Sequence, residues 1–180
     1  APQKILALHV HTVLEPGQFS FRGGMVMASA DELYMTIHAK GGHAAAPHLT
    51  ADPIVIASHI ILGLQQVISR NNNPFNPSVL SITSVQGGNT TNVIPSVVKL
   101  MGTFRAMNEE WRFSAHKLIE KYVMETAAVF GAEAMVKIDV GYPFVLNDEA
   151  LSARATELAK EFAGEENVGE TELRMGAEDF

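Results

Sequence analysis

The stretch Glu32-Leu33-Tyr34-Met35-Thr36-Ile37-His38-Ala39 alternates apolar and polar residues, which predicts a half-buried strand. The same period of two recurs at residues 79–85, 97–105 and 134–140. Helical spacing of apolar residues separates the first strand from the second, and the third from the fourth. The order strand–helix–strand–strand–helix–strand over residues 31–142 predicts a ferredoxin-like α+β fold, in which two helices cover one face of a four-stranded antiparallel sheet.

Local signals place the ends of the two helices. Asp52 is expected to cap the first, with Pro53 at a position where its missing N–H costs nothing. That helix is expected to run to about Ser69. Asn108 is expected to cap the second helix, and Gly131 suits its C-terminal end.

The flanking segments follow another pattern. Residues 4–10 form a short apolar run that predicts a buried strand, and 12–24 are rich in glycine and proline, as in a loop and hairpin. Near the other end, 147–164 predict a helix and 168–175 a strand. We therefore expect a satellite domain over 31–142, and pieces of a second, catalytic domain over 1–30 and 143–180.

Composition narrows the classes of function. The 180 residues carry a formal net charge of −7 with no basic block, which argues against binding to nucleic acid or to an anionic membrane surface. No cysteine is present, so a disulfide scaffold and a thiolate metal site within the chain are excluded, and a reducing cytoplasm is expected. The longest apolar run, 54–64, is interrupted by Ser58, His59 and Gly63 and is shorter than a membrane span of about 20 residues.

Three polar residues lie in settings that suit ligand binding. His43 follows Gly41-Gly42, Asn92 precedes Val93-Ile94-Pro95, and Arg105 ends a strand. Each alone is more often an ordinary surface, turn or strand-end residue. An amide and a guanidinium on adjacent strands can, however, hold a substrate carboxylate, which arginine binds with two hydrogen bonds.

Together these segments resemble the metal-dependent aminoacylase/carboxypeptidase (amidohydrolase) family, in which indole-acetyl-amino-acid hydrolases and N-acetyl-diaminopimelate deacetylases form one branch. The segments that carry the resemblance are Gly41-Gly42-His43-Ala44-Ala45-Ala46-Pro47, Gly88-Asn89-Thr90-Thr91-Asn92-Val93-Ile94-Pro95 and Gly102-Thr103-Phe104-Arg105. The resemblance implies that His43 reaches the active site of a partner subunit and stabilises the oxyanion of the tetrahedral intermediate. It also implies that Asn92 and Arg105 hold the substrate carboxylate.

The two ends of the chain extend the resemblance. Leu8-His9-Val10 matches a strand end of the family, which makes His9 the expected metal ligand; His11 points to the same side but is not a fixed ligand there. Gly176-Ala177-Glu178-Asp179-Phe180 resembles a loop near the metal centre, so Glu178 is a candidate substrate-binding residue. The adjacent pair Glu165-Glu166 follows a helix-ending glycine and reads as a solvated turn rather than the family's glutamate pair. The remaining histidines are expected to be structural: His38, His48, His59 and His116.

The resemblance implies a hydrolase with two divalent metal ions, zinc or else manganese or cobalt, that cleaves the amide of N-acyl amino acids or C-terminal peptide-like substrates. It implies a homodimer formed through the satellite domain. The family's first metal motif, its glutamate pair and its final histidine are absent, so the chain is expected to be a piece of such an enzyme and inactive alone. Two alternatives remain: a non-catalytic dimerisation module, and a ferredoxin-like regulatory domain that binds a small ligand. The second leaves Leu8-His9-Val10 and the terminal loop unexplained.

Overall fold

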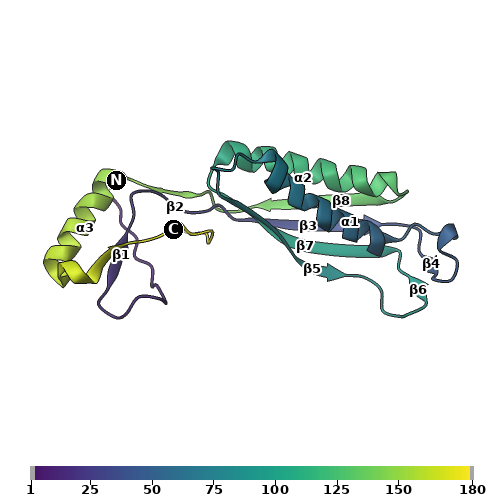
Figure 1. The fold of residues 1–180 in the computed structure, drawn as a ribbon, viewed down its shortest axis with the longest axis horizontal. Helices are drawn as coiled ribbons and strands as arrows, with labels where there is room; N and C mark the ends of the chain where they lie inside the picture. Colours follow the sequence, from purple (N-terminus) through teal and green to yellow (C-terminus); the bar gives the residue numbers. More distant parts are fainter. Residues whose placement is uncertain (1–2, 179–180) are drawn as a thin grey trace.

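The computed structural model describes residues 3–178, which form an elongated molecule of two parts (Figure 1). The larger part contains a four-stranded sheet and two long helices. The smaller part contains one helix, α3, and short strands from both ends of the chain. Two connecting segments join the parts, one before β3 and one after β8.

The sheet of the larger part has the strand order β5-β7-β3-β8, with each neighbouring pair antiparallel. Its strands are β3 (Asp31–His38), β5 (Ser78–Gln86), β7 (Val97–Ala106) and β8 (Glu133–Val140). The helices are α1 (Pro53–Gln66), extended by a π-helical turn η2 (Val67–Asn71), and α2 (Glu109–Val129). The predicted ferredoxin-like α+β fold is confirmed.

Both helices lie on one face of this sheet (Figure 1). Alternate residues of β3 and β7 point toward the helices and are fully or almost fully buried, because the side-chain period of a strand is two. They pack against apolar residues of α1 and α2 to form the core, with Leu33, Met35, Ile37, Leu100 and Phe104 from the sheet and Ile60, Leu64, Ile119 and Val123 from the helices. Within residues 3–178, no helix covers the other face of the sheet.

The expected helix caps are present. Asp52 Oδ1 accepts a hydrogen bond from the N–H of Ile54 at 2.9 Å, and Asn108 Oδ1 accepts one from the N–H of Trp111 at 2.8 Å. Gly131 follows α2 with φ of 74°, a left-handed conformation that favours glycine. These local signals fix where each helix begins and ends, as the sequence predicts.

Helix α1 is apolar on both its sides. The segment Pro53–Asn71 is long and apolar enough, by length and composition alone, to cross a membrane, and 33% of its most apolar window is buried. A helix of a protein core passes the same test, and α1 packs against the sheet and α2. Its outward side nevertheless exposes apolar residues, of which Ile54, Val55 and Leu62 are 45%, 51% and 72% exposed.

One detail of β5 differs from the sequence-based expectation. The alternation of 79–85 predicts that Val79 and Val85 share a face. A β-bulge between Ile82 and Ser84 inserts an extra residue, so that Val79 pairs with Arg105 while Val85 pairs with Leu100. Because paired residues point to the same side, Val85 lies on the helix-covered face, where it is 58% exposed at the edge of the sheet.

The smaller part corrects three predictions. It holds α3 (Glu149–Ala163), the 3-10 turn η3 (Glu165–Asn167) and four short strands: β1 (Phe19–Phe21), β2 (Gly24–Met27), β9 (Val145–Asn147) and β10 (Val168–Glu170). Strand β1 pairs with β10 in parallel and β2 with β9, so the expected hairpin within 12–24 is wrong. The expected strand over 168–175 ends at Glu170.

The expected buried strand over 4–10 is also wrong. This segment has no regular structure, and Leu8 and Val10 are each 86% exposed. No strand among the described residues pairs with this segment, so its backbone gains no sheet hydrogen bonds and its apolar side chains stay exposed. The domain limits 1–30, 31–142 and 143–180 stay a prediction. The two connecting segments are hydrogen-bonded to each other near these limits, since the N–H of Gly141 donates to the carbonyl oxygen of Ala30 at 3.0 Å.

Candidate functional site

His43 lies on β4 (Gly42–His43), a two-residue strand beyond the end of the main sheet that pairs with β6 (Val93–Ile94). The sequence predicts a loop here; the pairing His43↔Val93 fixes the backbone instead. His43 Nδ1 accepts a hydrogen bond from the N–H of Ala45 at 3.1 Å. Because an amide N–H can only donate, Nδ1 carries no proton, and Nε2 of the neutral ring is a donor. The ring is exposed, so this donor is available to a ligand.

Asn92 lies at the same corner of the molecule. Its carbonyl oxygen accepts a hydrogen bond from the N–H of Ala44 at 3.0 Å, which ties the residue after His43 to it. Its side-chain oxygen accepts from the hydroxyl of Thr90 at 3.1 Å. The amide nitrogen of Asn92 has no partner among the described residues. It therefore presents two N–H donors to solvent.

Arg105 lies at the opposite end of the sheet. It is the second-last residue of β7, whose first residue, Val97, lies at the end nearest β6. Eight strand residues of about 3.3 Å each separate Arg105 from that end, roughly 26 Å. The expectation that Asn92 and Arg105 lie together on adjacent strands is wrong within one chain, because Asn92 precedes β6, which pairs with β4 and not with β7.

His9 and Glu178 lie together although they are far apart in the sequence. His9 Nε2 is 3.9 Å from Glu178 Oε2, and the carboxylate is mostly buried. His9 Nδ1 donates to the carbonyl oxygen of Val10 at 2.9 Å, so Nε2 of the neutral ring carries the lone pair that a metal ion needs. His11 Nδ1 is buried and has no hydrogen-bond partner in the described part of the chain.

These groups can supply only part of the ligand set of a metal centre. Zinc in proteins takes four ligands from histidine, cysteine, aspartate and glutamate. No cluster of three such residues occurs between residues 3 and 178. An imidazole and a carboxylate on two separate segments are suitable donors, but a complete centre needs further groups.

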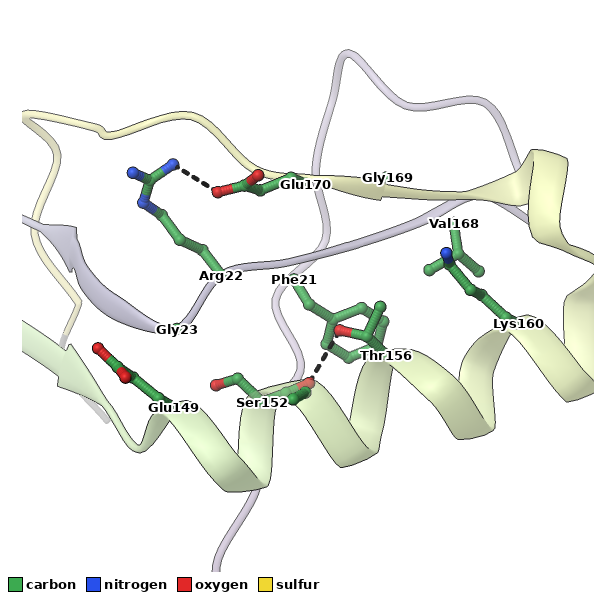
Figure 2. A pocket seen from close by; sticks show the side chains of 11 residues that line it. Phe21, Arg22, Gly23, Glu149, Ser152, Thr156, Lys160, Val168, Gly169 and Glu170 are labelled. Carbon is green, nitrogen blue, oxygen red and sulfur yellow. Dashed lines mark hydrogen bonds and ion pairs between the residues drawn. The ribbon is translucent and has the colours of Figure 1, made fainter.

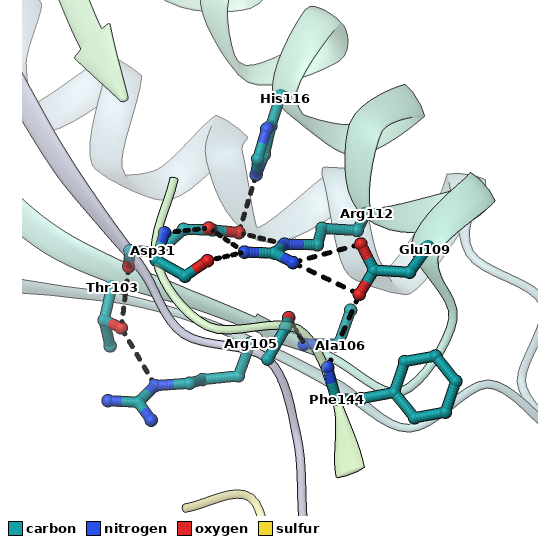
Figure 3. A network of polar contacts seen from close by, with 10 residues as sticks. Asp31, Thr103, Arg105, Ala106, Glu109, Arg112, His116 and Phe144 are labelled. Atoms are coloured by element: carbon teal, nitrogen blue, oxygen red, sulfur yellow. Dashed lines mark hydrogen bonds and ion pairs between the residues drawn. The ribbon is translucent and has the colours of Figure 1, made fainter. Parts of the chain in front are cut away.

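A buried polar network lies where the two connecting segments reach the sheet (Figure 3). The carboxylate of Asp31 accepts hydrogen bonds from Arg112 Nε at 2.9 Å, from Arg112 Nη2, from His116 Nε2 at 2.8 Å and from the N–H of Gly141 at 3.2 Å. Glu109 binds the other side of the Arg112 guanidinium and accepts from the N–H of Phe144. Burial raises the pKa of Asp31, but the hydrogen bonds from Arg112 and His116 outweigh burial and lower it to about 2.

Sequence reasoning missed this network. His116 is structural, as expected, but its partner was not predicted, because β3 brings the carboxylate of Asp31 beneath α2. The missed signal is the spacing of Arg112 and His116, four residues apart among the buried positions of the helix. His38, His48 and His59 take no part in a cluster of three potential metal ligands within the described residues. Glu165 and Glu166 lie in the exposed turn η3, as expected.

A shallow depression lies elsewhere, in the smaller part of the molecule. It has a volume of about 330 Å³ and lies between β1, β10 and α3, with Arg22, Glu149 and Lys160 among its lining residues (Figure 2). Glu170 there forms an ion pair with Arg22 at 3.1 Å. None of the predicted site residues lines it, so the candidate site consists of three separate groups: the exposed pair His43 and Asn92, the half-buried Arg105, and the pair His9 and Glu178.

Comparison with known proteins assigns the family. Residues 29–130 match the M20 peptidase dimerisation domain. The chain belongs to this family. Over 179 residues it is 37% identical to an N-acetyldiaminopimelate deacetylase from Bacillus cytotoxicus, covering 99% of this chain and 47% of that protein. It is 34% identical to thermostable carboxypeptidase 2 from Saccharolobus solfataricus, covering 98% and 44% respectively.

A solved structure agrees with these relatives. The YXEP protein of Bacillus subtilis, described as a dinuclear metal-binding peptidase of the M20 family, matches with a TM-score of 0.72 and 30% identity, over 96% of this chain and 42% of that one. The chain thus spans less than half the length of the relatives it matches. The dimerisation-domain match covers both helices and strands β3 to β7, a range that includes His43, Asn92 and Arg105.

Proposed function

We propose that this chain is part of a homodimeric di-metal amidohydrolase that cleaves the amide bond of N-acyl amino acids or of C-terminal peptide-like substrates. One observation carries the proposal: the predicted binding groups are N–H donors at opposite ends of one sheet, with His43 and Asn92 exposed and Arg105 half-buried. His43 and Asn92 offer N–H donors at one end, and Arg105 offers a guanidinium at the other. Such a split arrangement becomes a single site only when two copies of the sheet meet.

We assign the dimer interface to the edge strand β5. Within the described residues, no strand pairs with its outer edge. An open edge of nine residues leaves N–H and C=O groups that can form hydrogen bonds with a strand of another chain. Helix α1 lies on the β5 side of the sheet and exposes Ile54, Val55 and Leu62. A second copy that pairs with β5 and packs against α1 covers both features at once.

The two-fold symmetry of such a dimer brings His43 and Asn92 of one subunit close to Arg105 of the other. If β5 pairs antiparallel with its copy about a two-fold axis, the partner sheet runs in the opposite direction. The His43–Asn92 corner of one subunit then lies at the same end of the combined sheet as Arg105 of the other. That end also leads, through residues 27–30, to the smaller part that carries His9 and Glu178.

The residues then have distinct roles. Arg105 binds the substrate carboxylate, with Asn92 of the partner subunit supplying further N–H donors. His43 of the partner subunit donates from Nε2 to the oxygen on which negative charge develops. His9 would hold one of two divalent ions, zinc, manganese or cobalt, and Glu178 on the neighbouring loop would help to bind the substrate. The ions supply a water of lowered pKa when bound, and a glutamate outside this chain would accept its proton.

The proposal includes a cytoplasmic location, which a chain without cysteines permits. On this proposal the 180-residue chain alone is inactive, because His9 as a single ligand cannot hold a hydrolytic metal. The alternative, a non-catalytic dimerisation module, is favoured by the same exposed edge and apolar helix. The two are separated by assaying the full-length protein.

The test has two steps. The full-length protein is screened with divalent metals against a panel of N-acyl amino acids, and no turnover of any member contradicts the hydrolase. The inactive His43→Ala and Arg105→Ala proteins are then mixed and allowed to exchange subunits before activity is measured. If the site combines His43 of one subunit with Arg105 of the other, each mixed dimer has one intact site. Random exchange then restores about a quarter of wild-type activity, because half of the dimers are mixed. No recovery with exchange verified places both groups in one subunit.

A further inference from the structure

Arg105 does not extend freely from the sheet (Figure 3). It lies on β7, where Phe104 and Ala106 point into the core, so Arg105 and Thr103 share the face that no helix covers. The Nε–H of Arg105 donates a hydrogen bond to Thr103 Oγ1 at 3.1 Å. In the described residues this is the sole hydrogen bond or ion pair of the guanidinium. One edge of the group is therefore anchored, and Nη1 and Nη2 are left to bind a ligand.

The Thr103 hydroxyl is itself fixed in direction. It donates to the carbonyl oxygen of Asp31 at 3.0 Å. A hydroxyl has one hydrogen, so the proton committed to Asp31 leaves only lone pairs for Arg105. The Thr103 hydroxyl can therefore accept a hydrogen bond from the Arg105 guanidinium, and it has no second proton to donate to another acceptor.

The Asp31 end of this chain of bonds is rigid. The residue is 1% exposed, and its carboxylate is bound by Arg112, by His116 and by the main chain at Gly141. On the other side, Ser29 N–H donates to Ala106 O at 2.8 Å, and Ala106 N–H donates to Ser29 Oγ at 3.1 Å. The backbone on both sides of the Arg105 anchor is thus held by buried hydrogen bonds.

We infer that Thr103 is a positioning residue: with the carbonyl of Asp31 it holds the Arg105 guanidinium so that its two terminal nitrogens face the substrate carboxylate. This rests on the proposed role of Arg105 in carboxylate binding. A flexible arginine loses rotamer freedom when it binds, and an arginine held beforehand loses less. Thr103 thereby strengthens binding without touching the substrate.

The chain offers a matched pair of variants. Thr103→Val keeps the shape and the strand preference of threonine but removes the hydroxyl, whereas Thr103→Ser keeps the hydroxyl. The first experiment measures protection of the Arg105 Nε–H from exchange by NMR in the 180-residue chain, with the signal assigned by its loss in Arg105→Lys. We expect protection in the wild type and in Thr103→Ser, and at least a tenfold faster exchange in Thr103→Val. Equal exchange in all three overturns the inference.

The second experiment uses the full-length protein with the N-acyl amino acid that it hydrolyses fastest and the C-terminal carboxamide of the same compound. Thr103→Val should raise KM for the acid about tenfold with kcat within twofold, and Thr103→Ser should restore KM. The carboxamide lacks the charge that Arg105 binds, so its KM should not respond to Thr103→Val. An equal loss on both compounds assigns Thr103 a general structural role and overturns the inference.

Arg105→Ala distinguishes the proposed role of Arg105 in carboxylate binding from the positioning role of Thr103. A raised KM in Arg105→Ala together with an unchanged KM in Thr103→Val rejects the positioning role alone. An unchanged KM in Arg105→Ala removes Arg105 from the site, and the positioning role falls with it.

Discussion

The main chain holds His9 and His43 in opposite tautomers. His9 Nδ1 donates to the carbonyl of Val10, which leaves a lone pair on Nε2, whereas His43 Nδ1 accepts from the N–H of Ala45, which leaves a proton on Nε2. A lone pair suits a metal ligand and an N–H suits an oxyanion donor. The neutral rings of these two exposed histidines therefore offer different groups at Nε2, as the roles proposed for them require.

Loss of the His43 donor should slow the chemical step. In the full-length enzyme, His43→Ala is expected to lower kcat by about 10² to 10³, the usual scale for one oxyanion donor. Steady-state kinetics measure it, and His48→Ala, an exposed histidine in the following turn, serves as the control. An equal loss in both variants would point to damage to the loop rather than to loss of a donor.

Arg105 should respond to a change of geometry at constant charge. Arg105→Lys keeps the charge but not the planar fork, and a lost hydrogen bond to a charged group costs about 1.5–3 kcal/mol. The expected result is a fall in kcat/KM of roughly ten- to a hundredfold on a carboxylate-bearing substrate. Arg154→Lys, on the exposed surface of α3, is the matched control. Unchanged kinetics in Arg105→Lys would remove the residue from the site.

The buried carboxylate of Asp31 predicts a pH dependence of folding. Its pKa is about 2 in the folded chain and ordinarily 3.8, so its contribution to stability is complete above pH 4 and is lost as the pH falls toward 2. The contribution is about 2 kcal/mol, because each pH unit between the two values corresponds to about 1.4 kcal/mol. Denaturant unfolding of the wild type and of Asp31→Asn at several pH values measures it.

Asp31→Asn should also destabilise the chain at neutral pH by roughly 3 kcal/mol, because Arg112 keeps its charge in a buried position. Asp139→Asn is the control, since the ion pair of Asp139 with Lys137 lies on the surface and contributes little. A stability difference between wild type and Asp31→Asn that stays constant from pH 6 to pH 2 contradicts the lowered pKa.

The contact between α1 and α2 depends on a glycine. A Cβ atom at Gly63 would overlap the hydroxyl and ring of Tyr122. Gly63→Ala should therefore destabilise the chain by about 2 kcal/mol despite the better helix propensity of alanine, because overpacking forces the ring to move. Thermal unfolding measures the effect. Gly169→Ala, where nothing lies near the added atom, should be close to neutral, and Tyr122→Leu should relieve part of the loss.

The proposed interface predicts a change of oligomeric state. Leu62→Glu places a charge on the exposed side of α1 and should dissociate the dimer at micromolar concentration, as measured by sedimentation equilibrium. Phe162→Glu on α3, at an even more exposed apolar residue, is the control. Dissociation by Phe162→Glu and not by Leu62→Glu would move the interface to the smaller part.

The sequence by itself determined the fold of the larger part and the ends of its helices. Alternation such as that of Glu32–Ala39 and caps such as Asp52 and Asn108 are local, because a strand period and an N-cap are set by residues a few positions apart. The sequence also singled out His43, Asn92 and Arg105, because the segments that contain them resemble those of a known family.

The tertiary structure decided what lies next to what. Asn92 and Arg105 are 13 positions apart in the chain, and β7 separates them by its length, while the pairing of β6 with β4 places Asn92 beside His43, which no local pattern encodes. Likewise Asp31 meets Arg112 and His116 only because β3 passes beneath α2. A bulge of one residue in β5 reversed the facing of Val85. Contacts between distant segments depend on strand order and register, and these are fixed by the packing of the whole sheet against its helices.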